Sequence, residues 1–114
     1  MANTIKCLAN GQMATATTAV MYTAPTAAGS SVVVKSLILV NVSGTGAQTV
    51  NLMYSPSSTA GATTRLIPKD LSLAAGYSLT FTPMVTLGAG DKLIGYSTNA
   101  SATDYTISGV EITV

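Results

Sequence analysis

Turn-forming residues divide this chain into short runs of β-branched and apolar residues, at intervals of roughly 8–12 residues. No segment shows the 3.6-residue apolar periodicity of an amphipathic helix. Val, Ile and Thr favour strands because their stiff side chains fit a pleated surface. This spacing predicts an all-β fold: an antiparallel β-sandwich of about eight strands with a jelly-roll-like topology.

The runs also suggest where strands and turns lie. Asn10-Gly11 and the segment 43–46 have hairpin-turn character, and the run 48–54 is expected to return as the partner of the strand before it. Pro68 excludes a central strand because proline cannot donate a ladder hydrogen bond. We expect an N-terminal arm over 1–16 and one sandwich domain over 17–114. The expected strands are 4–8, 17–22, 31–42, 48–54, 71–73, 77–81, 84–87, 92–98 and 104–114.

The segment 31–42 is the longest apolar run. Strict alternation places Val32, Val34, Ile38 and Val40 on one face and Val33, Leu37 and Leu39 on the other. A strand that is apolar on both faces is expected to be covered on both faces, and another subunit could supply the second cover. Near the C-terminus the apolar set changes face at Gly109, which suits a β-bulge.

Composition excludes several classes of function. The chain has no His, so it cannot form a Ser-His-Asp triad or a His-ligated zinc site. Its one Cys, Cys7, cannot form a disulfide within the chain and is expected to be a small buried apolar residue, with a spare thiol as the alternative. The net charge of +1 gives no basic stripe for nucleic acid, and no run of 18 apolar residues predicts a membrane span.

The motifs that could carry chemistry are weak. The segment 88–92 resembles part of a phosphate loop but lacks the full spacing, so a tight turn containing Asp91 is the simpler interpretation. Asp70, Asp91 and Asp104 each lie at a turn or strand end, and their spacing does not bring them together. We therefore predict no catalytic residue, no bound metal and no cofactor.

Charged residues are only 8% of the chain, against about 25% in an average domain, so small uncharged residues must cover much of the surface. Three of the nine charges, Arg65, Lys69 and Asp70, fall in one irregular stretch. They form either a solvated loop with a local ion pair or a polar contact with a partner protein. The arm 1–13 and the run 31–42 are further candidate contact regions. The predicted partner contacts are Lys6, Lys35, Arg65, Lys69 and Asp70.

Several segments resemble small virion proteins of tailed bacteriophages, over roughly residues 17 to 114. They are Val33-Val-Lys-Ser-Leu-Ile-Leu-Val-Asn41, Thr49-Val-Asn-Leu52, Leu66-Ile-Pro-Lys-Asp-Leu-Ser-Leu73, Leu87-Gly-Ala-Gly-Asp-Lys-Leu93 and Tyr105-Thr-Ile-Ser-Gly-Val-Glu-Ile112. The first sixteen residues have no counterpart in that resemblance. These motifs are strand and turn patterns rather than catalytic signatures.

The resemblance implies a head decoration (cement) protein that bridges neighbouring capsid subunits on the virion exterior, after assembly in the host cytoplasm. It implies the major capsid protein as partner and a homo-oligomer, dimer or trimer. The low net charge and the lack of a long apolar run predict no nucleic-acid or membrane partner. A low-copy tail, collar or fibre-associated protein is the first alternative. A carbohydrate-binding sandwich is the second, with Tyr54, Tyr77 and Tyr96 as its aromatic platform.

Overall fold

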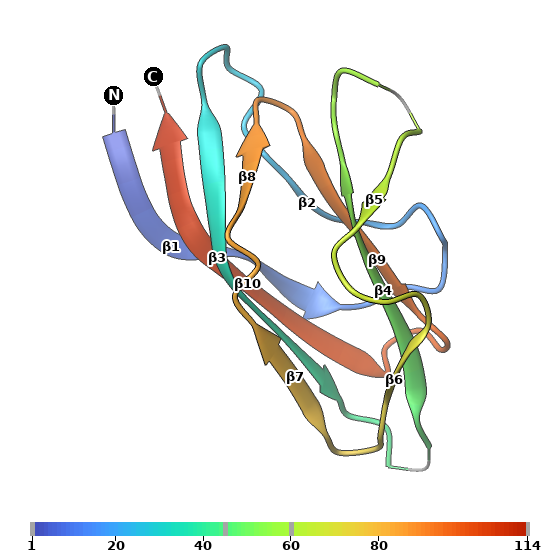
Figure 1. Ribbon diagram of the computed structural model, residues 1–114. Helices are drawn as coiled ribbons and strands as arrows, with labels where there is room; N and C mark the ends of the chain where they lie inside the picture. The colour runs from blue at the N-terminus through green and yellow to red at the C-terminus, as the bar shows by residue number, and fades with distance from the viewer. Residues whose placement is uncertain (1, 45, 60, 114) are drawn as a thin grey trace.

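A computed structural model describes residues 2–44, 46–59 and 61–113; Thr45 of the expected turn 43–46, Ala60, Met1 and Val114 lie outside the described residues. Its described part contains ten β-strands and no helix (Figure 1). The strands are β1 (Ala2–Gln12), β2 (Val20–Thr23), β3 (Ser31–Asn41), β4 (Gln48–Ser55), β5 (Thr64–Arg65), β6 (Leu71–Leu73), β7 (Ser78–Phe81), β8 (Val85–Gly88), β9 (Lys92–Ser97) and β10 (Thr103–Thr113).

The strands form two antiparallel sheets. Sheet A has the order β1-β10-β3-β7, with β8 also on β3, and sheet B has the order β2-β9-β4-β5, with β6 also on β4. β7 and β8 both pair with β3, and together they fill one edge position of sheet A. β5 and β6 both pair with β4 and fill one edge position of sheet B, so the ten strands occupy eight positions. Two facing four-position sheets in this order form a jelly roll, so the predicted fold class is confirmed.

The interruptions within these two edge positions have similar chemistry. Between β7 and β8 stand Pro83 and Met84, and Met84 has a positive φ of 51°. Between β5 and β6 stand Pro68 and Asp70, and Asp70 has a positive φ of 55°. A proline removes a ladder donor and a left-handed residue turns the chain, so each edge strand is broken in two. Pro68 thus lies outside any central strand, as predicted, in the interruption between β5 and β6.

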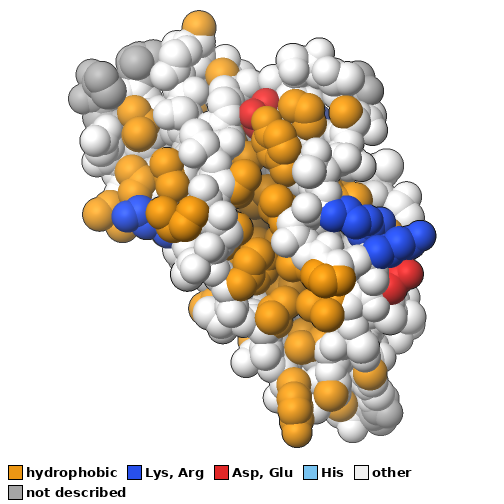
Figure 2. All heavy atoms as spheres, viewed as in Figure 1, with side chains coloured by type: hydrophobic (Ala, Val, Ile, Leu, Met, Phe, Trp, Pro, Cys, Tyr) orange, Lys and Arg blue, Asp and Glu red, His pale blue; other side chains and the backbone are white. Residues whose placement is uncertain are grey.

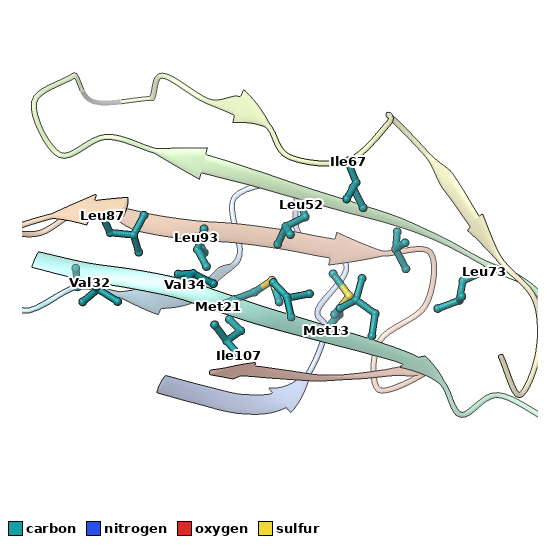
Figure 3. Packing of buried hydrophobic residues seen from close by; sticks show 14 residues of the cluster. Met13, Met21, Val32, Val34, Leu52, Ile67, Leu73, Leu87, Leu93 and Ile107 are labelled. Carbon is teal, nitrogen blue, oxygen red and sulfur yellow. The ribbon is translucent and has the colours of Figure 1, made fainter. Parts of the chain in front are cut away.

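The core lies between the two sheets. Figure 3 shows the side chains of Val32, Val34 and Ile107 from sheet A directed toward Leu52 and Leu93 from sheet B. Met13, from the connection between β1 and β2, and Met21, from β2 itself, fill the space between them. The full buried cluster is Met13, Met21, Ala24, Val32, Val34, Leu37, Leu39, Val50, Leu52, Ile67, Leu73, Leu87, Leu93 and Ile107.

The assignment of faces to β3 by strict alternation was wrong. In the pairing with β10, Gly109 lies opposite Val34 and Ser108 lies opposite Ser36, so Lys35 is an extra residue in β3. This bulge reverses the alternation after Lys35. Val32, Val34, Leu37 and Leu39 therefore all face the core, and Val33, Ile38 and Val40 face outward. The register shift predicted at Gly109 is confirmed, although the extra residue lies in the neighbouring strand.

Three other local expectations need correction. Asn10-Gly11 is not a turn, because β1 continues to Gln12 and pairs along β10. β4 is not the hairpin partner of β3, since β3 belongs to sheet A and β4 to sheet B. The two-residue strand β5 was not expected at all. The first and last strands lie side by side, with Ala2 opposite Thr113 (Figure 1).

Candidate interaction surfaces

The outer face of sheet A carries a patch of β-branched side chains. Ile5 of β1 lies opposite Val110 of β10, and Val110 lies opposite Val33 of β3. Residues directly opposite in an antiparallel sheet share a face, so these three form one row across three strands. Other outward-facing rows of the same sheet add further members, with Ile38 and Val40 lying beyond the row of Cys7, Ser108 and Ser36. We name the set the sheet-A patch: Ile5, Val33, Ile38, Val40, Val110 and Ile112.

The sheet-A patch is open to solvent in the single chain. Ile5 is 83% exposed, and Ile38 is also exposed. Cys7 shares this outer face, opposite Ser108, and is exposed, so the expectation that it is buried was wrong. Apolar side chains arranged in register on a free sheet face are typical of a surface that contacts another molecule.

A second feature is a polar cluster on the outer side of sheet B, centred on Asn51 of β4. Asn51 is 1% exposed. Its side-chain oxygen accepts hydrogen bonds from Arg65 Nη1 at 2.7 Å and from the backbone N–H of Asp70 at 3.0 Å. Its Nδ2 donates to Asp70 Oδ1 at 3.0 Å. Asn51 therefore ties both ends of the segment between β5 and β6 to the middle of sheet B.

The structure thus brings two predicted contact residues, Arg65 and Asp70, to one place, with Lys69 next to Asp70 in sequence. Lys69 is exposed, and no described residue forms a hydrogen bond or ion pair with its side chain. The other two predicted contacts lie on sheet A. Lys35 is the exposed bulge residue of β3, and Lys6 belongs to β1. Their role as partner contacts stays a prediction.

Lys6 has an internal partner. Its Nζ lies 3.2 Å from Glu111 Oε2 on the neighbouring strand, and Tyr22 Oη donates to the same oxygen at 3.4 Å. Burial, the negative charge of Glu111 and this hydrogen bond raise the pKa of Tyr22 to about 12. The group joins β2 of sheet B to the first and last strands of sheet A.

Asp91, at the turn before β9, is the most buried carboxylate. Its Oδ2 accepts hydrogen bonds from Tyr54 Oη and from the N–H of Gly88, each at 2.8 Å, and its Oδ1 accepts one from the N–H of Ser57 at 2.8 Å. Burial alone would raise the pKa of Asp91, but these hydrogen bonds outweigh it and lower the pKa below its ordinary 3.8. Sequence reasoning missed the roles of Asn51 and Tyr54, because the partners of each lie far away along the chain.

The segment 88–92 is the tight turn that the sequence favoured. The N–H of Asp91 donates to the carbonyl oxygen of Gly88 at 3.1 Å, and Gly90 adopts a positive φ of 78°. Asp70, Asp91 and Asp104 have separate partners, with Asp104 accepting from Gln12 at 3.1 Å. Among the described residues, no group of three or more His, Cys, Asp or Glu could hold a metal ion.

The aromatic platform considered for carbohydrate does not form. Tyr54 lies opposite Leu93 and packs against the core, whereas Tyr96 lies opposite Asn51 on the other face of sheet B. Tyr77, which is 69% exposed, lies in the turn before β7. In the part of the chain that the structure describes, no helix is long and apolar enough to cross a membrane.

Comparison with known proteins supports the fold. No protein-family model matches the chain, and no curated protein sequence matches it. Among solved structures, it is similar to a protein of Bacillus endospore appendages, described as disulfide-linked pili, with a TM-score of 0.56 and 20% identity over 99% of this chain and 88% of that one. It is also similar to a protein of infectious bursal disease virus, Gx strain, with a TM-score of 0.51 and 14% identity.

The alignment with the viral protein covers 96% of this chain and 31% of the viral chain, so the present chain spans about a third of that protein. At identities this low, the structural similarity shows a shared fold alone. The jelly roll deduced from the strand order is therefore found both in a pilus and in a virus particle.

Proposed function

We propose that this protein is a structural subunit of a repeating protein assembly, in which the outer face of sheet A contacts a neighbouring molecule. The observation that carries the proposal is the row formed by Ile5, Val110 and Val33, with the first residue almost fully exposed. Covering such a row removes apolar surface from water, which stabilises the contact by about 25 cal/mol for each Å² buried.

The composition of the surface supports this role. Small uncharged residues lose little side-chain entropy when they pack against a neighbour, and few charges need to be desolvated. The fold is also similar to that of a pilus protein and of a virus protein, both of which belong to assemblies. A role in an assembly on the outside of a cell or in a virion fits these features together.

Within that class we propose a head decoration protein of a tailed bacteriophage, which bridges neighbouring copies of the major capsid protein and itself forms a dimer or trimer. The sequence resemblance over residues 17 to 114 supports this choice. Each copy would stabilise the assembled shell by mass action, because it binds only the assembled state. A low-copy tail, collar or fibre-associated position is the alternative that the experiment below distinguishes.

The first experiment measures the number of copies of this chain per purified particle, by quantitative mass spectrometry against the major capsid protein. A ratio near one per capsid subunit, or a simple fraction of it, supports decoration. About a dozen copies or fewer supports a tail or collar position. Absence of the chain from particles contradicts both virion roles.

The second experiment tests the surface itself. Because β1 is a paired strand and Met13 belongs to the core, deleting residues 1–13 would remove part of the sandwich. We therefore compare Ile5→Asp with Val20→Asp, an exposed apolar residue of sheet B. Sedimentation velocity and particle binding should show loss of association for Ile5→Asp and none for Val20→Asp. Equal behaviour of the two variants would contradict an interface on sheet A.

A further inference from the structure

One side of the sandwich is left open between two sheet edges. The β7–β8 position ends sheet A and the β5–β6 position ends sheet B. Core-facing residues of these edges remain partly exposed, because no described segment covers this side. Figure 2 shows a continuous apolar band running along the molecule between the two edges. We name it the seam: Leu66, Leu71, Leu79, Phe81 and Val85.

The shape and the edges of the seam suit an extended chain. Both bordering strands are interrupted and have no further partner strand among the described residues. The interruptions at Pro68 and Pro83 lack a ladder donor, so an added strand can pair only with the short strands on either side of them. In the interruption between β7 and β8, Met84 is 57% exposed, and its flexible side chain can adapt to an apolar partner.

The charge beside the seam identifies the kind of partner. Arg65, Lys69 and Asp70 belong to the segment that borders it on the sheet-B side and give it a net positive charge; Figure 2 shows a group of basic side chains there, with an acidic one beside it. Arg65 uses Nη1 on Asn51, and the rest of its exposed guanidinium can meet a carboxylate. A partner segment with acidic side chains next to apolar ones would complement this border.

A second copy of the chain offers only carboxylates that already have a partner within their own chain. Each of the four acidic side chains is already engaged within the chain: Asp70 by Asn51, Asp91 by Tyr54, Asp104 by Gln12 and Glu111 by Lys6. Among the described residues, by contrast, Lys35, Lys69 and Lys92 have no hydrogen-bond or ion-pair partner. Charge complementarity therefore favours a different protein.

We infer that the seam binds an extended segment of a partner protein, whose apolar side chains cover the band and whose Asp or Glu side chains pair with Arg65 and Lys69. The inference rests on the proposed structural role, since it assigns one heterotypic contact to that role. It separates this contact from the sheet-A patch, which lies on the outer face of sheet A rather than between the sheet edges.

The probe is a synthetic heptapeptide of alternating Val and Glu flanked by Thr, titrated into the isotope-labelled full chain and followed by NMR. We expect saturable shifts of backbone amides in 64–73 and 78–88. Arg65→Glu with Lys69→Glu should weaken binding on the order of tenfold. Lys35→Glu with Lys92→Glu makes the same change in net charge outside the segments 64–73 and 78–88 and should leave the affinity within about twofold.

Two further variants guard against a folding artefact. Lys69→Glu alters a side chain without an internal partner, and Met84→Asp places a charge in the exposed interruption. Both should keep the thermal unfolding transition of the parent chain and weaken peptide binding. No saturable shift, shifts confined to the outer face of sheet A, equal loss in the Lys35 and Lys92 control, or preferred binding of a single-stranded oligonucleotide would overturn the inference.

The same variants separate this inference from the proposed function. If Ile5→Asp abolishes association while the parent seam does not bind the peptide, the inference fails and the structural role stands. If the peptide binds at the seam but the chain is absent from particles and Ile5→Asp behaves as Val20→Asp, the seam contact stands and the proposed function fails.

Discussion

The phenolic oxygen of Tyr54 donates a 2.8 Å hydrogen bond to the carboxylate of Asp91, 37 residues further along the chain. This bond links β4 to the turn that precedes β9. The N–H groups of Ser57 and Gly88 donate to the same carboxylate, so one side chain joins the loop after β4 to the end of β8. The hydrogen bond to Asp91, burial and the charge of Asp91 together raise the pKa of Tyr54.

Acid should destabilise the protein through Asp91. Because its pKa is lower in the folded chain than the ordinary 3.8, the folded state binds this proton less readily than the unfolded state. The stabilisation is fully present above about pH 4 and is lost as the pH falls through the folded-state pKa. Urea unfolding between about pH 2 and pH 7 should show this loss in the parent chain and a smaller one in Asp91→Asn.

At neutral pH, Asp91→Asn should lower the free energy of unfolding by about 1–3 kcal/mol, since it replaces one acceptor oxygen of a buried side chain with an NH2 group that faces hydrogen-bond donors. Asp104→Asn is the control, because Asp104 accepts its hydrogen bond from an exposed Gln12. An acid dependence that is the same in Asp91→Asn and the parent would contradict this account of Asp91.

Removing the Asn51 side chain should destabilise the edge of sheet B. Asn51→Ala deprives Arg65 and the N–H of Asp70 of their acceptor at a nearly fully buried site. We expect a loss of about 1–3 kcal/mol in chemical denaturation and faster amide hydrogen exchange over residues 64–71. Ser72→Ala, at an exposed neighbouring position, should change neither measurement. Unchanged exchange in Asn51→Ala would show that Asn51 does not hold this segment.

Gly109 should tolerate no side chain. A Cβ there would collide with the backbone carbonyl of Val33, and it would lie 3.1 Å from the Cα of Val34. Backbone atoms in a paired strand cannot move aside, so Gly109→Ala should cost about 1–3 kcal/mol or more. Gly95→Ala meets the flexible Met21 side chain first and should cost less.

Gly44→Ala provides the reference for this series, because a Cβ at Gly44 has nothing within 4 Å. Thermal unfolding of the three variants should therefore rank Gly44→Ala, Gly95→Ala and Gly109→Ala in order of increasing loss. A Gly109→Ala variant as stable as Gly44→Ala would mean that β3 and β10 are not this close.

Cys7 should react as an exposed thiol. The side chain lies on the outer face of sheet A and is accessible in the single chain. A chromogenic disulfide reagent should therefore modify one thiol per native chain, and Cys7→Ser should show no reaction. If the thiol of the isolated, dilute chain reacts only after denaturation, the placement of Cys7 is wrong. Slower modification in the assembled state is expected if a neighbour covers the sheet-A patch.

The sequence alone was sufficient for the fold class and for most strand positions. Alternation of apolar and polar residues is a local property with a period of two, and turn residues act on their immediate neighbours. Runs such as 48–54 and 71–73 therefore indicated β4 and β6 closely. The sequence also indicated a polar region at Arg65, Lys69 and Asp70. In the structure, Arg65 and Asp70 meet at Asn51.

Only the tertiary structure decided which strands pair and which faces are buried. One extra residue, Lys35, reverses the faces of β3, and nothing local to that residue predicts the bulge, since it depends on the match with β10. The partners of Asn51 and Asp91 are likewise fixed by register between strands, with Asn51 and Asp70 separated by 19 residues. Local chemistry determined the strands of this protein, whereas contacts between distant segments determined its surfaces, because register and sheet order depend on the whole packed core.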